Sequence, residues 1–232
     1  MDFRPIVAPS IRELFIQQVE GAILSGQLKP GDRLPTEREL ADTMHISKTV
    51  VHEGLRELHR LGFLDIASRR GVTVADYAQT GSLETLRAIM DFHGGLPDAK
   101  TAGSILQLRY YLEGPTMEEL AARHTPADMA ALQALQRQAE QAAQEGTDAL
   151  AEALFRYHRG ITFLSGNTIT PLLFNAFTRV NLEFWKEYIQ LTGIDRCLER
   201  LAQFTAHLEA GEGQAASSLL RQGLEQFITQ VR

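Results

Sequence analysis

The sequence contains one cysteine, Cys197, and one tryptophan among its 232 residues. A single cysteine excludes a disulfide within the chain and any zinc site that is built from several cysteines. No stretch approaches the roughly 18 consecutive apolar residues that a membrane-spanning helix needs. No basic segment followed by an apolar one opens the chain. We therefore expect a cytoplasmic protein without a membrane partner.

The motifs of the common enzyme classes are also missing. The sequence has no G-x-S-x-G nucleophile elbow, no phosphate-binding P-loop and no G-x-G-x-x-G after a predicted strand. The adjacent carboxylates Glu118 and Glu119 are expected on a solvated helix face and not across a site from each other. Cys197 has no evident activating partner, so we expect an inert buried thiol. From these absences we expect no catalytic activity and no cofactor.

The chain has no excess of positive charge. It carries 23 Lys and Arg against 29 Asp and Glu, which gives a net charge of −6 at pH 7. Residues 1–76 are nearly neutral, with 10 basic and 11 acidic side chains. Any binding to nucleic acid must therefore depend on a few locally exposed cations and not on bulk charge.

The first 76 residues show the pattern of three helices and a β-hairpin. Thr36 and Glu39 form a capping box that opens the second helix, and Ser47 is a suitable N-cap for the third. Two short β-prone runs, 63–66 and 72–74, follow and are joined by a basic turn. Three helices and a hairpin predict a winged helix-turn-helix domain over residues 1–76.

After a polar connector at residues 77–82 the pattern is helical throughout. The predicted helices cover residues 82–93, 101–123, 126–144, 147–164, 169–191, 194–210 and 213–231. Together with the N-terminal region they predict a mostly α protein, in which residues 83–232 form an all-helical bundle. Such a bundle is large enough to hold a ligand cavity.

The third helix of the N-terminal region has one apolar face and one polar face. Val51, Leu55 and Leu58 form the inward stripe. The 3.6-residue period therefore turns outward Lys48, Thr49, His52 and Arg56. In helix-turn-helix proteins the N-terminal part of this helix enters the major groove, where lysine can bind guanine and threonine can contact a thymine methyl group.

Further cations lie near the second helix and at the hairpin. Arg38 can reach a phosphate or a base edge, and Arg69 and Arg70 at the tip of the hairpin can enter a minor groove. The alternative is that these are ordinary solvated cations on a small helical domain. Their position on one predicted face favours contact with double-stranded DNA.

The segment from Leu28 to Ala41 resembles the signature of the GntR family of bacterial transcription regulators. The matching positions are Leu28, Pro30, Gly31, Asp32, Leu34, Pro35, Thr36, Glu37, Arg38, Glu39, Leu40 and Ala41, followed by Ser47, Thr49, Val50, Leu55, Leu58, Gly62 and Gly71. The resemblance implies a homodimer that binds a palindromic operator. It carries over Arg38, Thr49 and Gly71 as DNA-binding positions, and Ser47 is counted with them as a candidate. Lys48 and His52 stand where the family often has arginine, and neither side chain can reproduce the forked contact of arginine with a base.

The C-terminal part resembles the effector-binding domain of the FadR branch of this family. The carrying residues are Leu108, Arg109, Leu112, Glu113, Ala121, Ala122, Arg123, Tyr157, His158, Ser165, Gly166, Asn167, Leu208, Gly211 and Glu212. Many members of the branch hold a divalent metal with one Asp and three His. The corresponding positions here are Leu154, His158, Leu201 and Gly223. One ligand cannot hold a metal that needs about four, so we expect no metal in this chain.

The lost ligands point to a different effector chemistry. Metal-free relatives include the fatty-acid-responsive regulator that gives the branch its name and that binds long-chain acyl-CoA, and short segments of this chain match it. The resemblance therefore implies a small-molecule effector that is an organic acid or an acyl-CoA. The candidate effector-binding residues are Arg109, His158, Asn175, Arg179, Trp185 and Gly223.

Two of these residues have an equally plain structural interpretation. Arg109 can fork onto a carboxylate or phosphate of the effector, or it can pair with Glu113 four residues later on its own helix. His158 can be a hydrogen-bonded helix residue without any ligand role. The apolar helix over 169–191 can likewise belong to the core or form a cavity wall.

Two other functions remain open from the sequence. The winged domain could bind a protein instead of DNA, or the helical bundle could bind a small molecule without any DNA readout. DNA binding that weakens steeply with salt distinguishes a regulator from both, because phosphate contacts release counterions.

Overall fold

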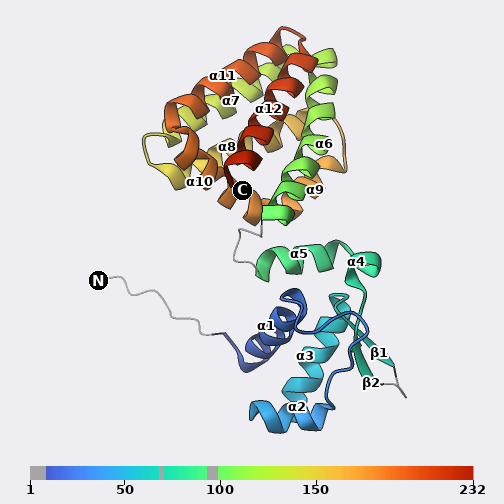
Figure 1. Ribbon diagram of the computed structural model, residues 1–232. Coiled ribbons are helices and arrows are strands. Elements are labelled where there is room, and N and C mark those ends of the chain that lie inside the picture. The colour runs from blue at the N-terminus through green and yellow to red at the C-terminus, as the bar shows by residue number, and fades with distance from the viewer. Residues whose placement is uncertain (1–8, 68–70, 93–98, 232) are drawn as a thin grey trace. The chain divides into compact units, whose positions relative to one another are not determined.

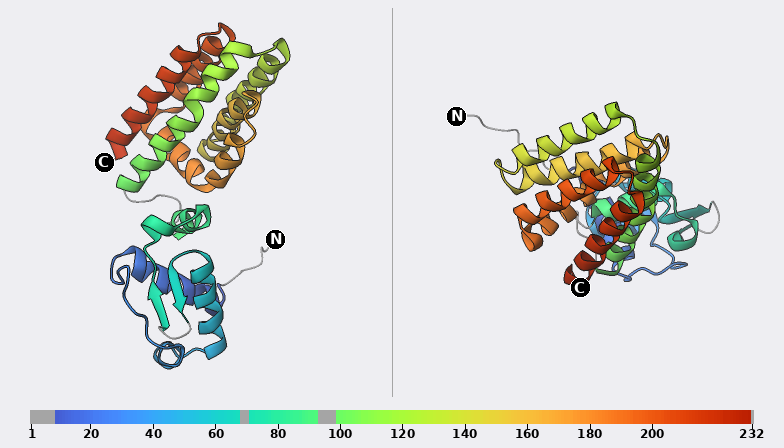
Figure 2. Two further views of the ribbon diagram at one scale, coloured as in Figure 1. Left: turned by 90° about the vertical axis from the view of Figure 1, so that its right-hand side faces the viewer. Right: turned by 90° about the horizontal axis from the view of Figure 1, so that it is seen from above.

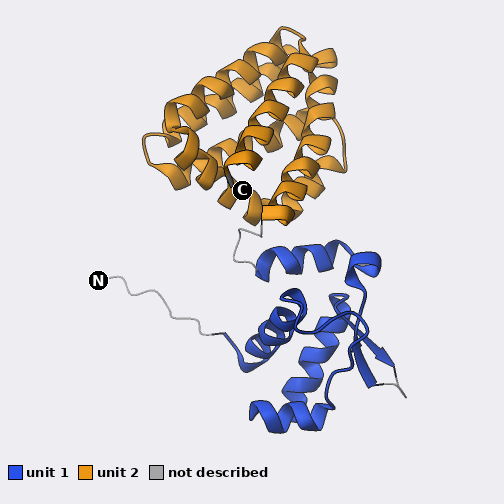
Figure 3. Ribbon diagram, viewed as in Figure 1, with its two compact units in different colours: residues 1–94 blue, residues 95–232 orange. Residues whose placement is uncertain are grey.

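The computed structural model describes residues 9–67, 71–92 and 99–231. The chain divides into two compact units, residues 1–94 and 95–232 (Figure 3). The predicted fold class is confirmed, because helices dominate both units and the described strands form one small hairpin in the first unit. Within the described ranges, no helix is long and apolar enough to cross a membrane.

The first unit begins with three helices and the hairpin (Figure 1). Its described elements are α1 (Ile11–Leu24), α2 (Glu37–Met44), α3 (Lys48–Arg60), β1 (Leu64–Ala67), β2 (Gly71–Val74), α4 (Tyr77–Thr80) and α5 (Leu83–Phe92). Ser10 and Thr36 each form a capping box, and the Ser47 hydroxyl accepts a hydrogen bond from the Val50 backbone N–H. The hairpin is antiparallel, with Leu64 opposite Val74. The winged helix-turn-helix plan is confirmed.

A hydrophobic core joins α1, α3 and the hairpin. Val51, Leu55 and Leu58 are buried on one face of α3, as the helical period predicts. The Phe15 ring of α1 packs directly on the α3 backbone at Gly54, where a Cβ would collide with the ring. Each buried side chain of this size contributes about 1.5–3 kcal/mol. This core determines which face of α3 turns outward.

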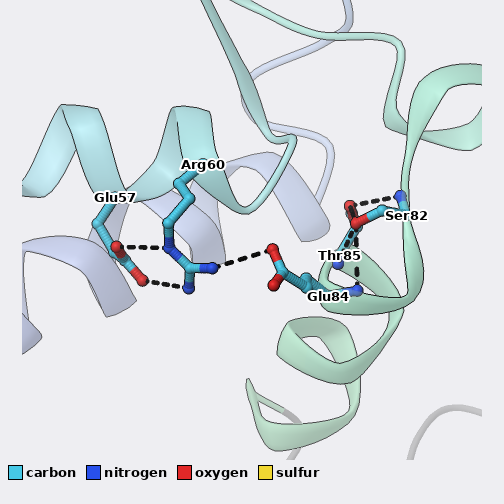
Figure 4. Close-up of polar contacts among 5 residues, drawn as sticks. All are labelled: Glu57, Arg60, Ser82, Glu84 and Thr85. Atoms are coloured by element: carbon cyan, nitrogen blue, oxygen red, sulfur yellow. Dashed lines mark hydrogen bonds and ion pairs between the residues drawn. The ribbon is translucent and has the colours of Figure 1, made fainter.

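Helix α5 packs against this core. Thr85 is buried, and a Cβ added to Gly62 at the end of α3 would lie 2.7 Å from the Thr85 hydroxyl. Figure 4 shows the polar contacts nearby: Arg60 binds Glu57 through two nitrogens and donates to Glu84 of α5 at 2.9 Å. Helix α5 is therefore held to α3 by close packing and by an ion pair.

The compact units differ from the boundaries that the sequence predicts. Residues 83–92, predicted to open the C-terminal domain, lie in the first unit, and the predicted connector at 77–82 contains helix α4. The physical reason is that α5 buries Thr85 and Met90. Helical periodicity alone does not tell which of two cores an amphipathic helix joins.

The second unit consists of helices within its described residues (Figures 1 and 2). They are α6 (Ala99–Arg123), α7 (Pro126–Ala142), α8 (Thr147–Leu164), α9 (Thr170–Ala176), α10 (Thr178–Thr192), α11 (Ile194–Glu209) and α12 (Gly213–Val231). Helices α6 and α12 lie side by side, and α8 packs against both α7 and α10. Thr125 forms a capping box with Asp128, and Pro126 opens α7.

One predicted helix is divided in two. The sequence predicts a single helix over 169–191, whereas α9 and α10 are separated at Phe177, whose φ of −104° and ψ of 17° interrupt the helix. Phe174, Phe177 and Val180 are all buried around this break. The apolar residues of both helices therefore reach the core, and only the continuity of the helix differs from the expectation.

Candidate functional site

Helix α3 presents a polar surface at its N-terminal end. Lys48, Thr49, His52 and Arg56 are all exposed, because the opposite face of the helix is buried in the core. Ser47 is also exposed, but it is the N-cap, and its hydroxyl already accepts a hydrogen bond from the backbone of the first turn. The geometry therefore leaves Lys48, Thr49 and His52 accessible at the end of a helix that helix-turn-helix proteins insert into the major groove.

His52 is held in place by helix α2. Its Nδ1 lies 2.8 Å from Oε1 of Glu37, so the two helices of the helix-turn-helix are joined by a polar contact on their outer side. Because an ionised carboxylate accepts hydrogen bonds, the Nδ1–H group donates to Glu37 and Nε2 is the ring nitrogen left for another partner. The sequence analysis names Glu37 only as a position of the family signature and does not predict its contact with His52.

Arg38 is exposed on α2 and has a loose ion pair with Asp42, at 3.8 Å. An exposed pair at this distance contributes little energy and restrains the guanidinium weakly. Arg38 can therefore exchange this partner for a phosphate at small cost.

A basic residue that the sequence pattern does not single out, Arg33, lies beside the hairpin. The guanidinium of Arg33 lies against Gly71, where a Cβ would be 3.1 Å from Nη2, and Arg33 pairs with Thr73 in an isolated β-bridge. Gly71 has a φ of +81°, which favours glycine. The predicted contacts Arg69 and Arg70 lie outside the described residues. In the sequence, Arg33 is visible only as a basic residue in the loop before Leu34. Its position beside the hairpin depends on the fold.

The second unit encloses a cavity between α6, α8, α10, α11 and α12. Its volume is about 40 Å³, room for a few water-sized groups. The lining is mostly leucine and phenylalanine, and its polar members are Arg109, His158, Trp185, Tyr188 and Arg200. Of the predicted effector-binding residues, the fold brings together Arg109, His158, Trp185 and Gly223.

A buried charged cluster forms one wall of this cavity. Glu113 accepts a hydrogen bond from Nε of Arg109 at 2.5 Å, and its other oxygen lies 2.6 Å from Nδ1 of His158. All three side chains are buried. Although burial favours a neutral carboxyl group, the Arg109 charge and the His158 contact hold the pKa of Glu113 below its ordinary value. Glu113 is therefore ionised and accepts from both neighbours.

Burial acts on His158 in the opposite sense. It lowers the pKa of the imidazole and outweighs the attraction of Glu113, while the charges of Arg109 and Arg200 add to the lowering. A neutral imidazole whose Nδ1–H donates to Glu113 is therefore the favoured form. The ring is also packed among aromatics, with centroid distances of 5.0 Å to Trp185 and 5.4 Å to Phe204.

Of the two interpretations of Arg109, the structure shows the ion pair with Glu113, and contact with an effector stays a prediction. The Arg109 guanidinium also lies over the Trp185 ring at 4.4 Å. One nitrogen, Nη2, nevertheless has no hydrogen-bond partner, and the buried Trp185 Nε1 also has none. Unpaired buried donors are costly and rare in native proteins. Both lie in residues that line the cavity, so they are suited to a ligand that accepts hydrogen bonds.

The four positions at which the resemblance implies a metal also line this cavity. Leu154, Leu201 and Gly223 provide no ligating atom, and Nδ1 of His158 is used by Glu113. Within the described part of the chain, no three His, Cys, Asp or Glu side chains are grouped so that they could hold a metal ion. The residues present do not fit a metal centre.

Two predicted effector residues lie away from the cavity. Asn175 and Arg179 are exposed and are not among the lining residues. Their apolar neighbours Phe174 and Val180 are buried, so Asn175 and Arg179 lie on the outer sides of α9 and α10. In their place the fold supplies Tyr188 and Arg200, which the sequence pattern does not select. Arg200 directly precedes Leu201, one of the four positions at which the resemblance implies a metal ligand. This neighbourhood is the one feature of the sequence that could have pointed to Arg200.

The remaining thiol behaves as a core residue. Cys197 is buried in the cavity wall, and burial raises the pKa of its thiol to about 11. Such a thiol stays protonated at neutral pH, and the reactive thiolate is absent.

The two units match two known protein families. Residues 12–74 match "Bacterial regulatory proteins, gntR family", and residues 104–226 match the "FCD domain". The "HTH-type transcriptional regulator Mce2R" of Mycobacterium tuberculosis is 30% identical over 57% of this chain and 54% of its own length. This chain therefore spans about half the length of the first curated relatives that it matches.

Other relatives cover more of the chain. The "Fatty acid metabolism regulator protein" of Klebsiella pneumoniae is 26% identical over 71% of this chain and 68% of its own length. A solved structure of Lar, which "controls the expression of the Listeria monocytogenes agr system", shares the fold with a TM-score of 0.61. It is 13% identical and covers 97% of this chain and 98% of that one. The family matched by residues 12–74 and the curated relatives named here are described as regulators. The chain belongs to the FCD domain family, whose model covers more than half of its residues, and its first unit carries a helix-turn-helix domain of the GntR family of bacterial regulatory proteins.

Proposed function

We propose that this regulator is a homodimer that binds a palindromic operator with helix α3 and the hairpin, and that a small organic anion in the cavity of the second unit changes its affinity for DNA. The observation that carries the DNA-binding part is the exposure of Lys48, Thr49 and His52 on α3. Two copies of one reading helix match the two halves of a palindrome. The near-neutral charge of residues 1–76 makes these few contacts decisive.

The cavity favours an organic acid over an acyl-CoA. Its volume of about 40 Å³ is far below the roughly 300–1,000 Å³ of a usual ligand pocket, so a large thioester would require extensive rearrangement. Unpaired donors on Arg109 and Trp185 suit a carboxylate, which only accepts hydrogen bonds. The effector is therefore proposed to be a small carboxylate that displaces a few side chains on entry.

The DNA-binding proposal is tested by fluorescence anisotropy with the promoter region upstream of the chain's own gene. We expect tight, sequence-selective binding whose affinity falls steeply as salt rises, because each phosphate contact releases counterions. Lys48→Ala should weaken operator binding about tenfold or more, since a base or phosphate contact contributes about 1–3 kcal/mol.

The matched control is Arg87→Ala, which removes an exposed cation from α5 of the same unit. It should leave operator affinity nearly unchanged. Equal losses in the two variants would show that the first unit attracts DNA through general charge only. Absent or salt-insensitive binding to every DNA tested would contradict the proposal and favour a protein partner.

A further inference from the structure

The side chain of Arg200 lies directly against the backbone of α12. A Cβ added to Gly223 would be 2.7 Å from Nη1 of Arg200 and 3.0 Å from its Cζ. Both residues line the cavity. Only glycine at position 223 therefore leaves room for the guanidinium in this position.

The charges around the cavity do not cancel. Arg109 and Arg200 are cations, Glu113 is ionised and paired with Arg109, and burial keeps His158 neutral. Among the described residues, no carboxylate lies within ion-pair distance of Arg200. The cluster therefore carries one positive charge in excess, on the half-buried Arg200, beside leucine and phenylalanine side chains. One anionic group would balance it.

The hydrogen-bonding groups of the cavity also favour an anionic ligand. Nη2 of Arg109 and Nε1 of Trp185 are buried donors without partners. Both residues are more than nine-tenths buried, with 6% and 8% of their surface exposed. A carboxylate has two oxygens that only accept, and arginine binds it through a planar fork.

Arg200 also stands at the boundary of the cavity. Its Nη1 donates a 2.7 Å hydrogen bond to the Tyr188 hydroxyl. The same two residues line an outer groove of about 240 Å³, whose charged members besides Arg200 are Arg196 and Glu199. Because Tyr188 and Arg200 line both spaces, the groove and the cavity adjoin at this hydrogen bond.

We propose that Arg200 is a second anion-binding residue and that, together with Arg109, it binds the carboxylate of a short aliphatic monocarboxylic acid in this cavity. The inference rests on the proposed function, because it takes the cavity as the effector site. The excess of one positive charge selects a monoanion, the apolar lining selects a hydrocarbon body, and the small volume selects a short one.

Trp185 provides a direct readout, because it is the only tryptophan of the chain and lines the cavity. The purified full-length protein is titrated with butanoate, with butanamide as the uncharged analogue and with succinate as the dianion. We expect butanoate to change Trp185 fluorescence with saturation, butanamide to have no effect, and succinate to bind at least tenfold more weakly.

The variants isolate Arg200. Arg200→Gln should weaken butanoate binding at least tenfold, and Arg200→Lys should weaken it less, because it keeps the charge. Gly223→Ala adds only a methyl group that displaces the flexible end of Arg200, so it should weaken binding while the thermal unfolding temperature stays within a few degrees. Arg137→Gln removes an exposed cation of α7 that lines neither the cavity nor the groove, so this variant should bind butanoate as the wild type does.

Several results would overturn the inference. These are equal binding of butanoate and butanamide, wild-type affinity in both Arg200→Gln and Gly223→Ala, no saturable response to butanoate, or a response that requires added Zn²⁺. Operator binding measured on the same samples separates the two proposals. Intact salt-dependent operator binding with any of these results removes Arg200 alone, whereas loss of sequence-selective DNA binding in the wild type removes the proposed function.

Discussion

Glu20 is a carboxyl group in the core of the first unit. It lies on α1 with only 6% of its surface exposed, and its Oε1 has no hydrogen-bond partner. Burial, with a smaller contribution from the charge of Asp91 on α5, raises the pKa of Glu20 to about 7. Folding therefore favours the protonated form. The stability that this gives is complete below pH 4.5, the ordinary value for the group, and is lost as the pH rises through about 7.

We predict that Glu20→Gln makes the first unit less sensitive to pH. The amide resembles the protonated acid, so the variant should match the wild type near pH 5 and exceed its stability at pH 8. One pKa unit corresponds to about 1.4 kcal/mol, so the difference at pH 8 approaches about 3 kcal/mol. Thermal unfolding followed by circular dichroism at both pH values measures it.

The control for this prediction is Glu13→Gln. Glu13 is an exposed carboxylate on the same helix, and its hydrogen bonds to Ser10 lower its pKa. It should lose a little stability at both pH values and gain none at pH 8. An equal shift of Glu20→Gln at pH 5 and pH 8 would mean that Glu20 does not titrate in this range.

At this scale the sequence predicts side chains on helix faces better than their partners. Lys48 and His52 are exposed as the 3.6-residue period predicts, because facing outward follows from the inward stripe alone. The contact of His52 with Glu37 joins residues 15 positions apart on different helices, so it depends on tertiary structure. For Arg109 the local spacing suggested a pair with Glu113 or a ligand contact, and the third partner, His158, comes from another helix.

Among the elements, the docking of α5 depends on one glycine. Gly62 has a φ of +82°, and a Cβ there would lie 2.7 Å from the Thr85 hydroxyl. We predict that Gly62→Ala destabilises the first unit by about 1–2 kcal/mol from backbone strain and further by pushing Thr85 away. Hydrogen exchange of the α5 amides should increase more than that of α3.

Gly26→Ala is the matched control. Gly26 has a similar φ of +77° after α1, but nothing lies within 4 Å of a Cβ added there. It should show the backbone cost without faster exchange in α5. If both variants affected α5 equally, the Gly62–Thr85 contact would not be what holds this helix.

Element boundaries were predictable where caps mark them and less so where packing decides. Most predicted helices, including those with Thr36, Ser47 and Thr125 as caps, appear within a few residues of their expected ends. The break at Phe177 and the assignment of α5 to the first unit escaped prediction. Both depend on which core the apolar residues reach, and a periodic pattern is the same in either case.

For the whole molecule, effector binding and operator binding must be linked if the proposed function holds. Whatever factor butanoate changes in operator affinity, the operator must change in butanoate affinity. Anisotropy of labelled operator with and without butanoate gives the first factor. Trp185 fluorescence titrations with and without operator give the second, and we expect the two to agree.

We predict that substitution of Arg109 abolishes this linkage without abolishing DNA binding. Arg109→Ala removes the donor facing the cavity but leaves Glu113 buried without its cation, which can cost about 3–5 kcal/mol. Arg109→Lys keeps a charge near Glu113 and removes only the fork, so it separates ligand binding from stability. Both variants should bind operator with wild-type affinity and lose the response to butanoate. The control Arg156→Ala, which removes an exposed cation from α8, should keep the response.

An unchanged response in Arg109→Lys and Arg109→Ala would exclude Arg109 from the effector site. A loss of operator binding in Arg109→Lys would show instead that this cluster is needed for the DNA-binding form itself.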